Sequence, residues 1–134
     1  MAAMTSRHDW YVIVADDDPD WRGLMAVALQ SAGFHVFEAG DGWELVAHCR
    51  ALLAVPSQRV LVLSDVEMPG MTGLTAMAQL QGYADRLRVI LITGTHSAST
   101  LAGADAAGAH AVMHKPVSRL ELLRMVNAVT PGGG

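Results

Sequence analysis

The sequence predicts an α/β protein in which a parallel sheet carries helices on both of its faces. Three observations lead to this prediction. Short apolar runs rich in β-branched residues alternate with segments in which apolar residues recur at helical spacing. Glycine, proline and capping residues separate the two kinds of segment. Strands that alternate with helices form right-handed βαβ units, and such units build a doubly wound parallel sheet.

Five segments have the pattern of strands. Residues 10–15 form a nearly continuous apolar run, which is typical of a strand that is buried on both faces. Residues 34–39 alternate between apolar and polar side chains, which predicts a strand near an edge of the sheet. The other strands are expected at residues 60–64, 89–93 and 111–114.

The helices are predicted from their capping residues and apolar stripes. The first begins after Asp18, because an aspartate can cap a helix and Pro19 suits its first position. It ends before Gly33, and its stripe consists of Trp21, Leu24, Met25, Ala28, Leu29 and Ala32. Others are expected at 41–53, 72–81 and 118–129, two of them with capping-box pairs, Asp41 with Glu44 and Ser118 with Glu121. Residues 97–107 are mostly Ala, Gly, Ser and Thr, which predicts a weakly held helix.

The composition is that of one globular domain. The chain has 134 residues, of which 51% are hydrophobic and 16% are charged, so it can bury a core. The net charge of −4 argues against non-specific nucleic-acid binding. Because the sequence has no bilayer-spanning apolar run and no signal-peptide pattern, we expect a cytoplasmic protein without membrane contact. We expect residues 1–9 to be an N-terminal extension, 10–129 the domain, and 130–134 a tail or linker.

Polar residues that can carry chemistry follow the predicted strands. In a doubly wound sheet, ligands bind outside the carboxyl ends of the strands. The first strand is followed by Asp16 and Asp17, the third by Asp65, and the fifth by Lys115, while the fourth ends in Thr93. We therefore expect carboxylates, one hydroxyl and one lysine to meet at one edge of the sheet.

This set of groups suits metal-assisted phosphoryl transfer. Neighbouring carboxylates repel one another unless a cation relieves them, and Mg²⁺ prefers carboxylate oxygens. A lysine and a threonine hydroxyl can hold the remaining phosphoryl oxygens. One carboxylate can act as the nucleophile and form an acyl phosphate.

Other polar residues near the strand ends have simpler explanations. Asp18 and Asp20 are alternative metal ligands, but Asp18 is better explained as the helix cap and Asp20 as a first-turn charge favoured by the helix dipole. The six histidines lack the spacing of a metal site, and we expect no direct role for His96 or His114. Trp21 and Trp43 fit helix faces, and we expect either core or near-surface packing for them.

Four motifs at these strand ends resemble a known family. The sequences VADDDP, SDVEMPGMTGL, LITG and HKP occur in this order, with 28 residues from Asp65 to Thr93 and 22 from Thr93 to Lys115. Over about residues 10–129 the chain resembles the receiver domain of bacterial two-component response regulators. The resemblance implies a flavodoxin-like (βα)₅ fold with a five-stranded parallel sheet in the order 2-1-3-4-5.

The resemblance also implies roles for the acidic residues. Asp65 matches the phosphoacceptor, and Asp17 matches the direct Mg²⁺ ligand. Asp16 matches the acid that holds metal-bound water. Glu67 matches the position whose backbone carbonyl completes the metal site. Glu67 and Thr95, two residues after Asp65 and Thr93, are expected to tune the lifetime of the phosphoryl group.

For the switch residues, the resemblance implies that Thr93 moves toward the phosphoryl group and that Lys115 pairs with it. Pro116 matches a proline that follows a cis peptide bond. Val112 stands where the family usually has an aromatic switch residue. Because valine cannot swing as a tyrosine does, we expect an atypical output that involves ordering of residues 97–107.

The expected partner is a phosphohistidine donor, either a sensor histidine kinase or a histidine phosphotransfer protein. A homodimer through the fourth helix, fifth strand and fifth helix is an arrangement that the family allows. The chain is then a signalling domain and not an enzyme, apart from self-catalysed phosphotransfer and autodephosphorylation.

Two other functions remain open. A haloacid dehalogenase-type phosphohydrolase also uses an aspartate nucleophile with Mg²⁺, but it needs a second aspartate where this chain has Glu67. A pseudo-receiver would bind partners without being phosphorylated, which Val112 allows and the complete acidic set opposes.

Overall fold

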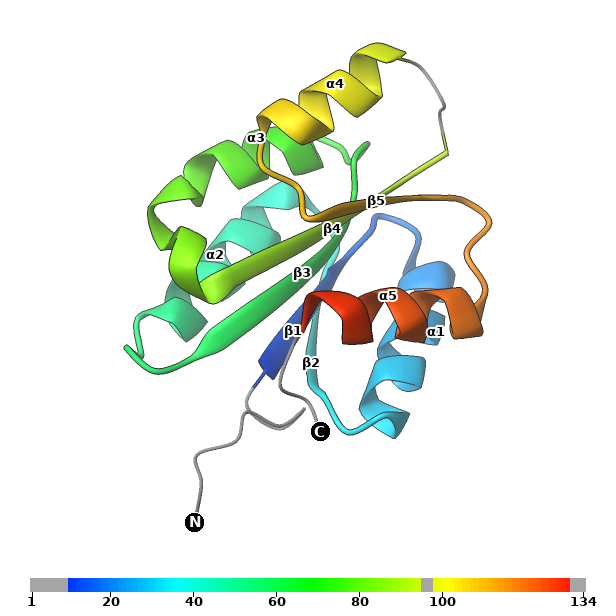
Figure 1. Ribbon diagram of the computed structural model, residues 1–134, viewed down its shortest axis with the longest axis horizontal. Helices are drawn as coiled ribbons and strands as arrows, with labels where there is room; N and C mark the ends of the chain where they lie inside the picture. Colours follow the sequence, from blue (N-terminus) through cyan, green and yellow to red (C-terminus); the bar gives the residue numbers. More distant parts are fainter. Residues whose placement is uncertain (1–9, 95–97, 131–134) are drawn as a thin grey trace.

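The predicted parallel sheet is present in the computed structural model, which describes residues 10–94 and 98–130. The sheet has five parallel strands in the order β2-β1-β3-β4-β5, as expected (Figure 1). The strands are β1 (Trp10–Ala15), β2 (His35–Ala39), β3 (Arg59–Asp65), β4 (Leu87–Thr93) and β5 (Ala111–His114). The helices are α1 (Pro19–Ser31), α2 (Gly42–Leu53), α3 (Gly73–Gln79), α4 (Ala98–Ala106) and α5 (Arg119–Val129), with a short 3₁₀ segment η2 (Gln81–Arg86) after α3.

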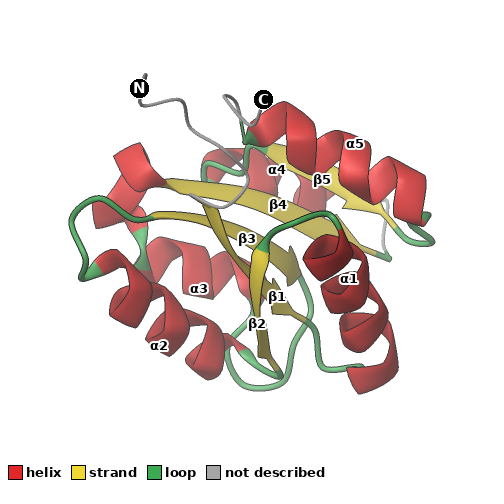
Figure 2. Cartoon of the chain, turned by 90° about the horizontal axis from the view of Figure 1, so that it is seen from below, coloured by secondary structure: helices red, strands yellow, loops and turns green. Residues whose placement is uncertain are grey.

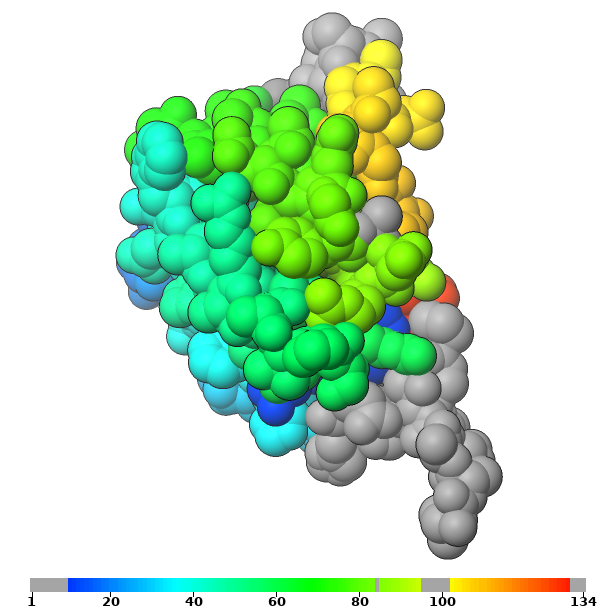
Figure 3. All heavy atoms as spheres, turned by 90° about the vertical axis from the view of Figure 1, so that its left-hand side faces the viewer, coloured from blue at the N-terminus to red at the C-terminus, as the bar shows by residue number. Residues whose placement is uncertain are grey.

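The sheet separates two hydrophobic cores. Side chains alternate along β3, so that Val60 and Val62 lie in one core and Leu61 and Leu63 in the other. The first core is covered by α2, α3 and α4, and the second by α1 and α5 (Figure 2). Figure 3 shows the first face from outside, where α2 and α3 form a continuous surface and α4 lies at its margin. Both faces of the central strands are therefore buried, as their continuous apolar runs predict.

The predicted caps hold the helix starts. The Asp18 carboxylate accepts the N–H groups of Asp20 and Trp21 at 3.0 and 3.4 Å. The Asp41 carboxylate accepts the Glu44 N–H at 2.8 Å, and Ser118 Oγ accepts the Glu121 N–H at 3.1 Å. These bonds satisfy backbone donors that have no partner inside a helix.

The end of the third helix and the apolar stripe of the first helix differ from the prediction. The third helix ends at Gln79 instead of residue 81, because Leu80 has a non-helical backbone and the chain continues as 3₁₀ turns. Leu24 is 69% exposed although it lies on the predicted apolar stripe. It lines an apolar groove between α1 and α5, so the stripe is wider than the contact that α1 makes with the core.

The weak helical pattern of residues 97–107 forms α4 over Ala98–Ala106. Ala104 of this helix is fully buried and lies in the core that α2 and α3 also cover. Within the described residues, no helix combines the length and apolar character needed to cross a bilayer.

Candidate functional site

The structure brings the predicted strand-end residues to one edge of the sheet. Asp65 and Thr93 are the last residues of β3 and β4, and Asp16 and Lys115 directly follow β1 and β5. In the register of the sheet, Asp65 lies beside Ile92 of β4, and Thr93 lies beside His114 of β5. Because the strands are parallel, segments far apart in sequence end side by side.

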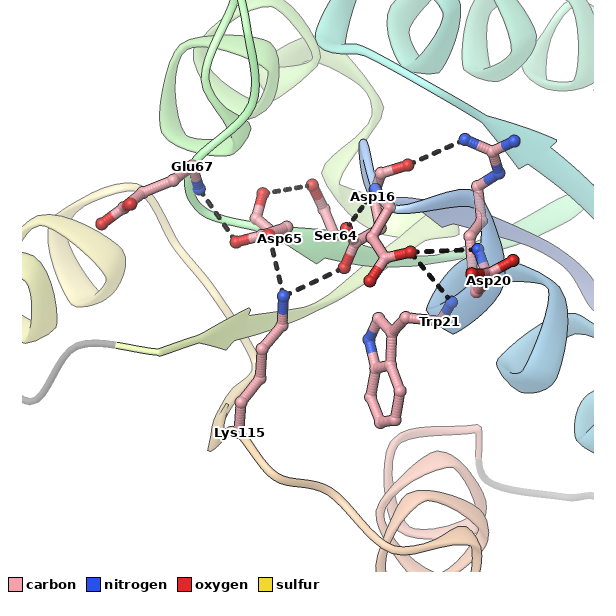
Figure 4. Close-up of polar contacts among 9 residues, drawn as sticks. Asp16, Asp20, Trp21, Ser64, Asp65, Glu67 and Lys115 are labelled. Atoms are coloured by element: carbon pink, nitrogen blue, oxygen red, sulfur yellow. Dashed lines mark hydrogen bonds and ion pairs between the residues drawn. The ribbon is translucent and has the colours of Figure 1, made fainter.

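Lys115 joins two of the acidic residues. Its Nζ lies 3.0 Å from Asp65 Oδ2 and 3.2 Å from Asp16 Oδ2 (Figure 4). The lysine comes from the far end of the chain, and its position follows from the place of β5 at the sheet edge. It supplies a positive charge between two carboxylates that would otherwise repel each other.

Three carboxylates form a group of the right chemistry for a divalent cation. Oxygens of Asp16, Asp17 and Asp65 all lie within 4.8 Å of one another. Asp16 and Asp65 are buried, whereas Asp17 is exposed, so a bound cation could keep part of its water shell. Oxygen-only donors at this spacing fit Mg²⁺. The cluster opens into a depression of about 430 Å³ that is lined by Asp17, Asp65, Glu67, Met68, Pro69 and Thr72.

Burial and charge set the protonation of this group. Burial raises the pKa of the Asp16 carboxyl, and the hydrogen bonds from the Asp18 N–H and Lys115 only partly oppose this rise. Burial lowers the pKa of Lys115, but the hydrogen bonds and charges of Asp65 and Asp16 outweigh it and hold the pKa above its usual value. Lys115 therefore stays cationic, while Asp16 would gain from a second cation.

Backbone N–H groups orient the two buried carboxylates. The Asp18 N–H donates to Asp16 Oδ1 at 2.9 Å, and the Glu67 N–H donates to Asp65 Oδ1 at 3.0 Å. The Glu67 side chain points away from Asp16 and Asp65 (Figure 4). Asp18 caps α1, as expected, and lies outside the cluster.

Two residues near Asp65 were missed by the sequence analysis. Ser64 is fully buried, and its Oγ donates to the backbone carbonyl of Asp65 at 2.8 Å. Gly73 begins α3 directly against the same carbonyl, since a Cβ there would lie 2.5 Å from it. The MPGMTG motif indicates a turn before a helix, but no local signal indicates either of these contacts.

The remaining predicted residues lie around the same edge. Thr93 is fully buried, and its carbonyl accepts the Lys115 N–H at 2.8 Å. The Lys115–Pro116 peptide bond is cis, as expected. Val112 is half-buried and packs against the core that α2, α3 and α4 cover.

The other expectations concern aromatic and histidine residues. Trp21 lies on α1 and lines a hollow beside Lys115 and Pro116, nearer to the site than its helix-face pattern indicates. Trp43 is 65% exposed at the start of α2. His114 is half-buried on β5. Thr95 and His96 lie outside the described residues.

Comparisons with known proteins agree on one family. A family model described as the response regulator receiver domain matches residues 12–127. The chain is 37% identical over 121 residues to the response regulator MprA of Mycobacterium tuberculosis, covering 88% of this chain and 49% of MprA. It is 30% identical over 123 residues to the protein PilH of Pseudomonas aeruginosa, covering 90% of this chain and 98% of PilH.

Some relatives are much longer. The chain is 35% identical over 127 residues to the CAI-1 autoinducer sensor kinase/phosphatase CqsS of Vibrio cholerae, covering 92% of this chain but 18% of CqsS. It thus spans about half of MprA and a fifth of CqsS, and nearly all of PilH.

Solved structures share the fold. The chemotaxis protein CheY4 of Vibrio cholerae superposes with a TM-score of 0.78 at 29% identity, covering 89% of this chain and 97% of that one. CheY of Borrelia burgdorferi, in a complex with CheX, BeF₃ and Mg²⁺, superposes with a TM-score of 0.79 at 26% identity, covering 90% of this chain and 88% of that one.

Proposed function

The chain belongs to the response regulator receiver domain family, and on this premise we propose that it accepts a phosphoryl group on Asp65 in a two-component phosphorelay. The observation that carries the proposal is the contact of Lys115 Nζ with Asp65 Oδ2 at 3.0 Å, beside a group of three carboxylates. The proposed working unit is residues 10–129.

Each residue of the site has a distinct role in the proposed transfer. An Asp65 oxygen attacks the phosphorus, the bond from phosphorus to the donor's imidazole nitrogen breaks, and the electron pair stays on that nitrogen. Lys115 holds a phosphoryl oxygen by charge, and the Thr93 hydroxyl binds another after it moves toward the group. The protein's main contribution is to position these groups and neutralise charge.

Mg²⁺ would be held by Asp16, Asp17, Asp65 and the Glu67 backbone carbonyl, and when bound it supplies positive charge to the phosphoryl oxygens. Asp17 would bind it directly, while Asp16 would hold its water. The donor in this proposal is a phosphohistidine of a sensor histidine kinase or a histidine phosphotransfer protein. Phosphorylation then changes the surface formed by α4, β5 and α5. In this proposal the domain acts in the cytoplasm.

Intact-mass measurement tests this function. We would incubate the protein with Mg²⁺ and a small acyl phosphate, with EDTA as the metal-free comparison. The expected result is a gain of one phosphoryl group, which is absent with EDTA and absent in Asp65→Asn. The matched control is Asp20→Asn, which removes an exposed charge of α1 outside the carboxylate cluster and should leave the modification unchanged.

The other outcomes contradict the proposal in different ways. Rapid turnover of the acyl phosphate over many cycles would indicate a phosphohydrolase. A folded wild-type protein that gains no mass would indicate a pseudo-receiver that only binds partners.

A further inference from the structure

Arg22 of α1 contacts the backbone of Asp16 from outside the carboxylate cluster. Its Nη1 donates to the backbone carbonyl of Asp16 at 2.9 Å, and its Nε lies 2.9 Å from Glu38 Oε1 on β2. The guanidinium thus joins α1, the end of β1 and the end of β2. Its side chain is 21% exposed, so most of it is withdrawn from water.

The carbonyl that Arg22 holds belongs to the peptide unit between Asp16 and Asp17. The N–H of Asp16 donates to the Ala39 carbonyl at 3.1 Å, so both backbone polar groups of Asp16 have partners from other elements. The orientation of this peptide plane decides where the chain carries Asp17.

The placement of the Asp17 carboxylate depends on this peptide unit more than the placement of the Asp16 carboxylate does. Asp16 is held through its carboxylate by the Asp18 N–H and by Lys115. Within residues 10–94 and 98–130, the Asp17 carboxylate makes no hydrogen bond or ion pair. The backbone position from which the Asp17 carboxylate projects therefore depends on the peptide plane that Arg22 fixes.

Glu38 and Gly40 set the position of the guanidinium. The planar guanidinium donates in fixed directions, toward Glu38 from Nε and toward Asp16 from Nη1. A Cβ on Gly40 would lie 3.2 Å from Nη1, so this glycine leaves the room that the arginine occupies. Glu38 is 44% exposed, so the ion pair contributes little energy and acts mainly by fixing geometry.

From these contacts we propose that Arg22, held by Glu38, is a positioning residue for the Mg²⁺ site and acts through the peptide between Asp16 and Asp17. The inference rests on the proposed function, because that function supplies the metal. Outer-shell groups that orient ligands commonly change metal affinity by about tenfold or more when removed.

Two roles of Arg22 predict opposite changes in Mg²⁺ affinity. If its positive charge were its main influence, removing it would strengthen cation binding. If it positions Asp17, removing it weakens binding. Arg22→Met removes both the charge and the donors while keeping the apolar stem, so the sign of the change decides between them.

The test is an NMR titration with Mg²⁺ alone, following backbone amide shifts at Asp17 and Glu67 in fully folded protein. We expect the Mg²⁺ Kd to rise about tenfold in Arg22→Met. Arg22→Lys, which keeps the charge but not the two fixed donors, and Glu38→Gln should each raise it by less. If Arg22→Met does not fold, Arg22→Lys carries the test.

Arg86→Met is the matched control. Arg86 also donates to backbone carbonyls, those of Leu53, Val55 and Gln58, but it lies at the opposite end of the sheet. The substitution should lower the unfolding temperature and leave the Mg²⁺ Kd within about twofold of wild type.

The outcomes separate this inference from the proposed function. An unchanged or lower Mg²⁺ Kd in the folded Arg22 variants would overturn the inference alone. A wild-type protein that binds Mg²⁺ but is not phosphorylated would contradict the proposed function. The inference would then still be decided by the Mg²⁺ Kd of the Arg22 variants relative to wild type, and a higher Kd in the variants would support it. A wild-type protein that binds no Mg²⁺ would overturn both.

Discussion

Gly73, the first residue of α3, lies against the backbone of the proposed phosphoacceptor. A Cβ at this position would be 2.5 Å from the Asp65 carbonyl oxygen and 3.0 Å from Ser64 Oγ. The Gly73 N–H also donates to the Val66 carbonyl at 2.9 Å. The missing side chain therefore lets α3 begin close enough to hold the loop that follows β3.

A pair of glycine substitutions tests this account. Gly73→Ala should lower the free energy of unfolding by about 2 kcal/mol, because backbone must move to relieve the contact. Gly23→Ala should instead raise it by about 1 kcal/mol, since Gly23 lies inside α1 with nothing within 4 Å of its Cβ position. Urea unfolding measures both. Equal effects of the two substitutions would contradict the account.

Among the secondary-structure elements, the short strand β5 pairs with β4 over four residues, and the His110 side chain continues this pairing by one more residue. Ala111 pairs with Ile90, which leaves Val89 beyond the end of the ladder. The His110 N–H donates to the Val89 carbonyl at 2.8 Å, and the Val89 N–H donates to His110 Nδ1 at 3.0 Å. The imidazole thus accepts the backbone N–H in place of a strand carbonyl. It can do so only when neutral, because both nitrogens of a protonated imidazole are donors.

This contact predicts a pH dependence of stability. Burial, with a smaller effect of the Arg88 charge, lowers the pKa of His110 below its usual 6.5. As pH falls, the unfolded chain binds the proton before the folded protein does. The contribution of His110 to the free energy of unfolding is therefore complete above about pH 6.5, and it is lost as the pH falls from there through the lower pKa that His110 has in the folded protein. His110 is an exposed residue, so water screens this effect and keeps it small. Between about pH 7.5 and 5, the free energy of unfolding of His110→Asn should fall slightly less than that of wild type.

Denaturation curves at several pH values, together with an NMR titration of the imidazole, measure this effect. Identical pH dependence in wild type and His110→Asn would show that the contact does not respond to protons. A measured His110 pKa at or above the usual value would contradict the expected lowering.

The whole molecule places its site where loops from both faces of one sheet meet. The loop leading to α1, on one face, carries Asp16 and Asp17, and the loop leading to α3, on the other, carries Glu67. A change at Asp65 can therefore reach either core. On the side of α4 and β5, Val112 stands where the family resemblance implies an aromatic switch residue, and Ala104 of α4 lies in the core.

We expect phosphorylation to change the order of α4 and β5 and not to depend on rotation of a side chain at position 112. Amide exchange over residues 98–116, measured with and without phosphorylation, should slow in the phosphorylated protein. Asp65→Asn treated in the same way is the control and should not change. Unchanged exchange over this segment in phosphorylated protein would contradict the expectation.

The strand and helix pattern, the caps and the strand-end residues could all be predicted from the sequence, because each depends on local spacing. Apolar period predicts Trp10–Ala15 and Ala111–His114 as strands, and a single aspartate before Pro19 predicts a helix start. The common edge at which Asp16, Asp65 and Lys115 meet then follows from the parallel arrangement alone.

Only the tertiary structure decided which atoms meet at that edge. The distance from Lys115 to two aspartates, the approach of Gly73 to Asp65, and the hold of Arg22 on the peptide before Asp17 all join segments that are distant in sequence or belong to different elements. The exposure of Leu24 likewise depends on how far α5 covers α1. Local periodicity determines which face of an element is apolar, whereas packing between elements determines how much of that face is buried and which polar groups come within bonding distance.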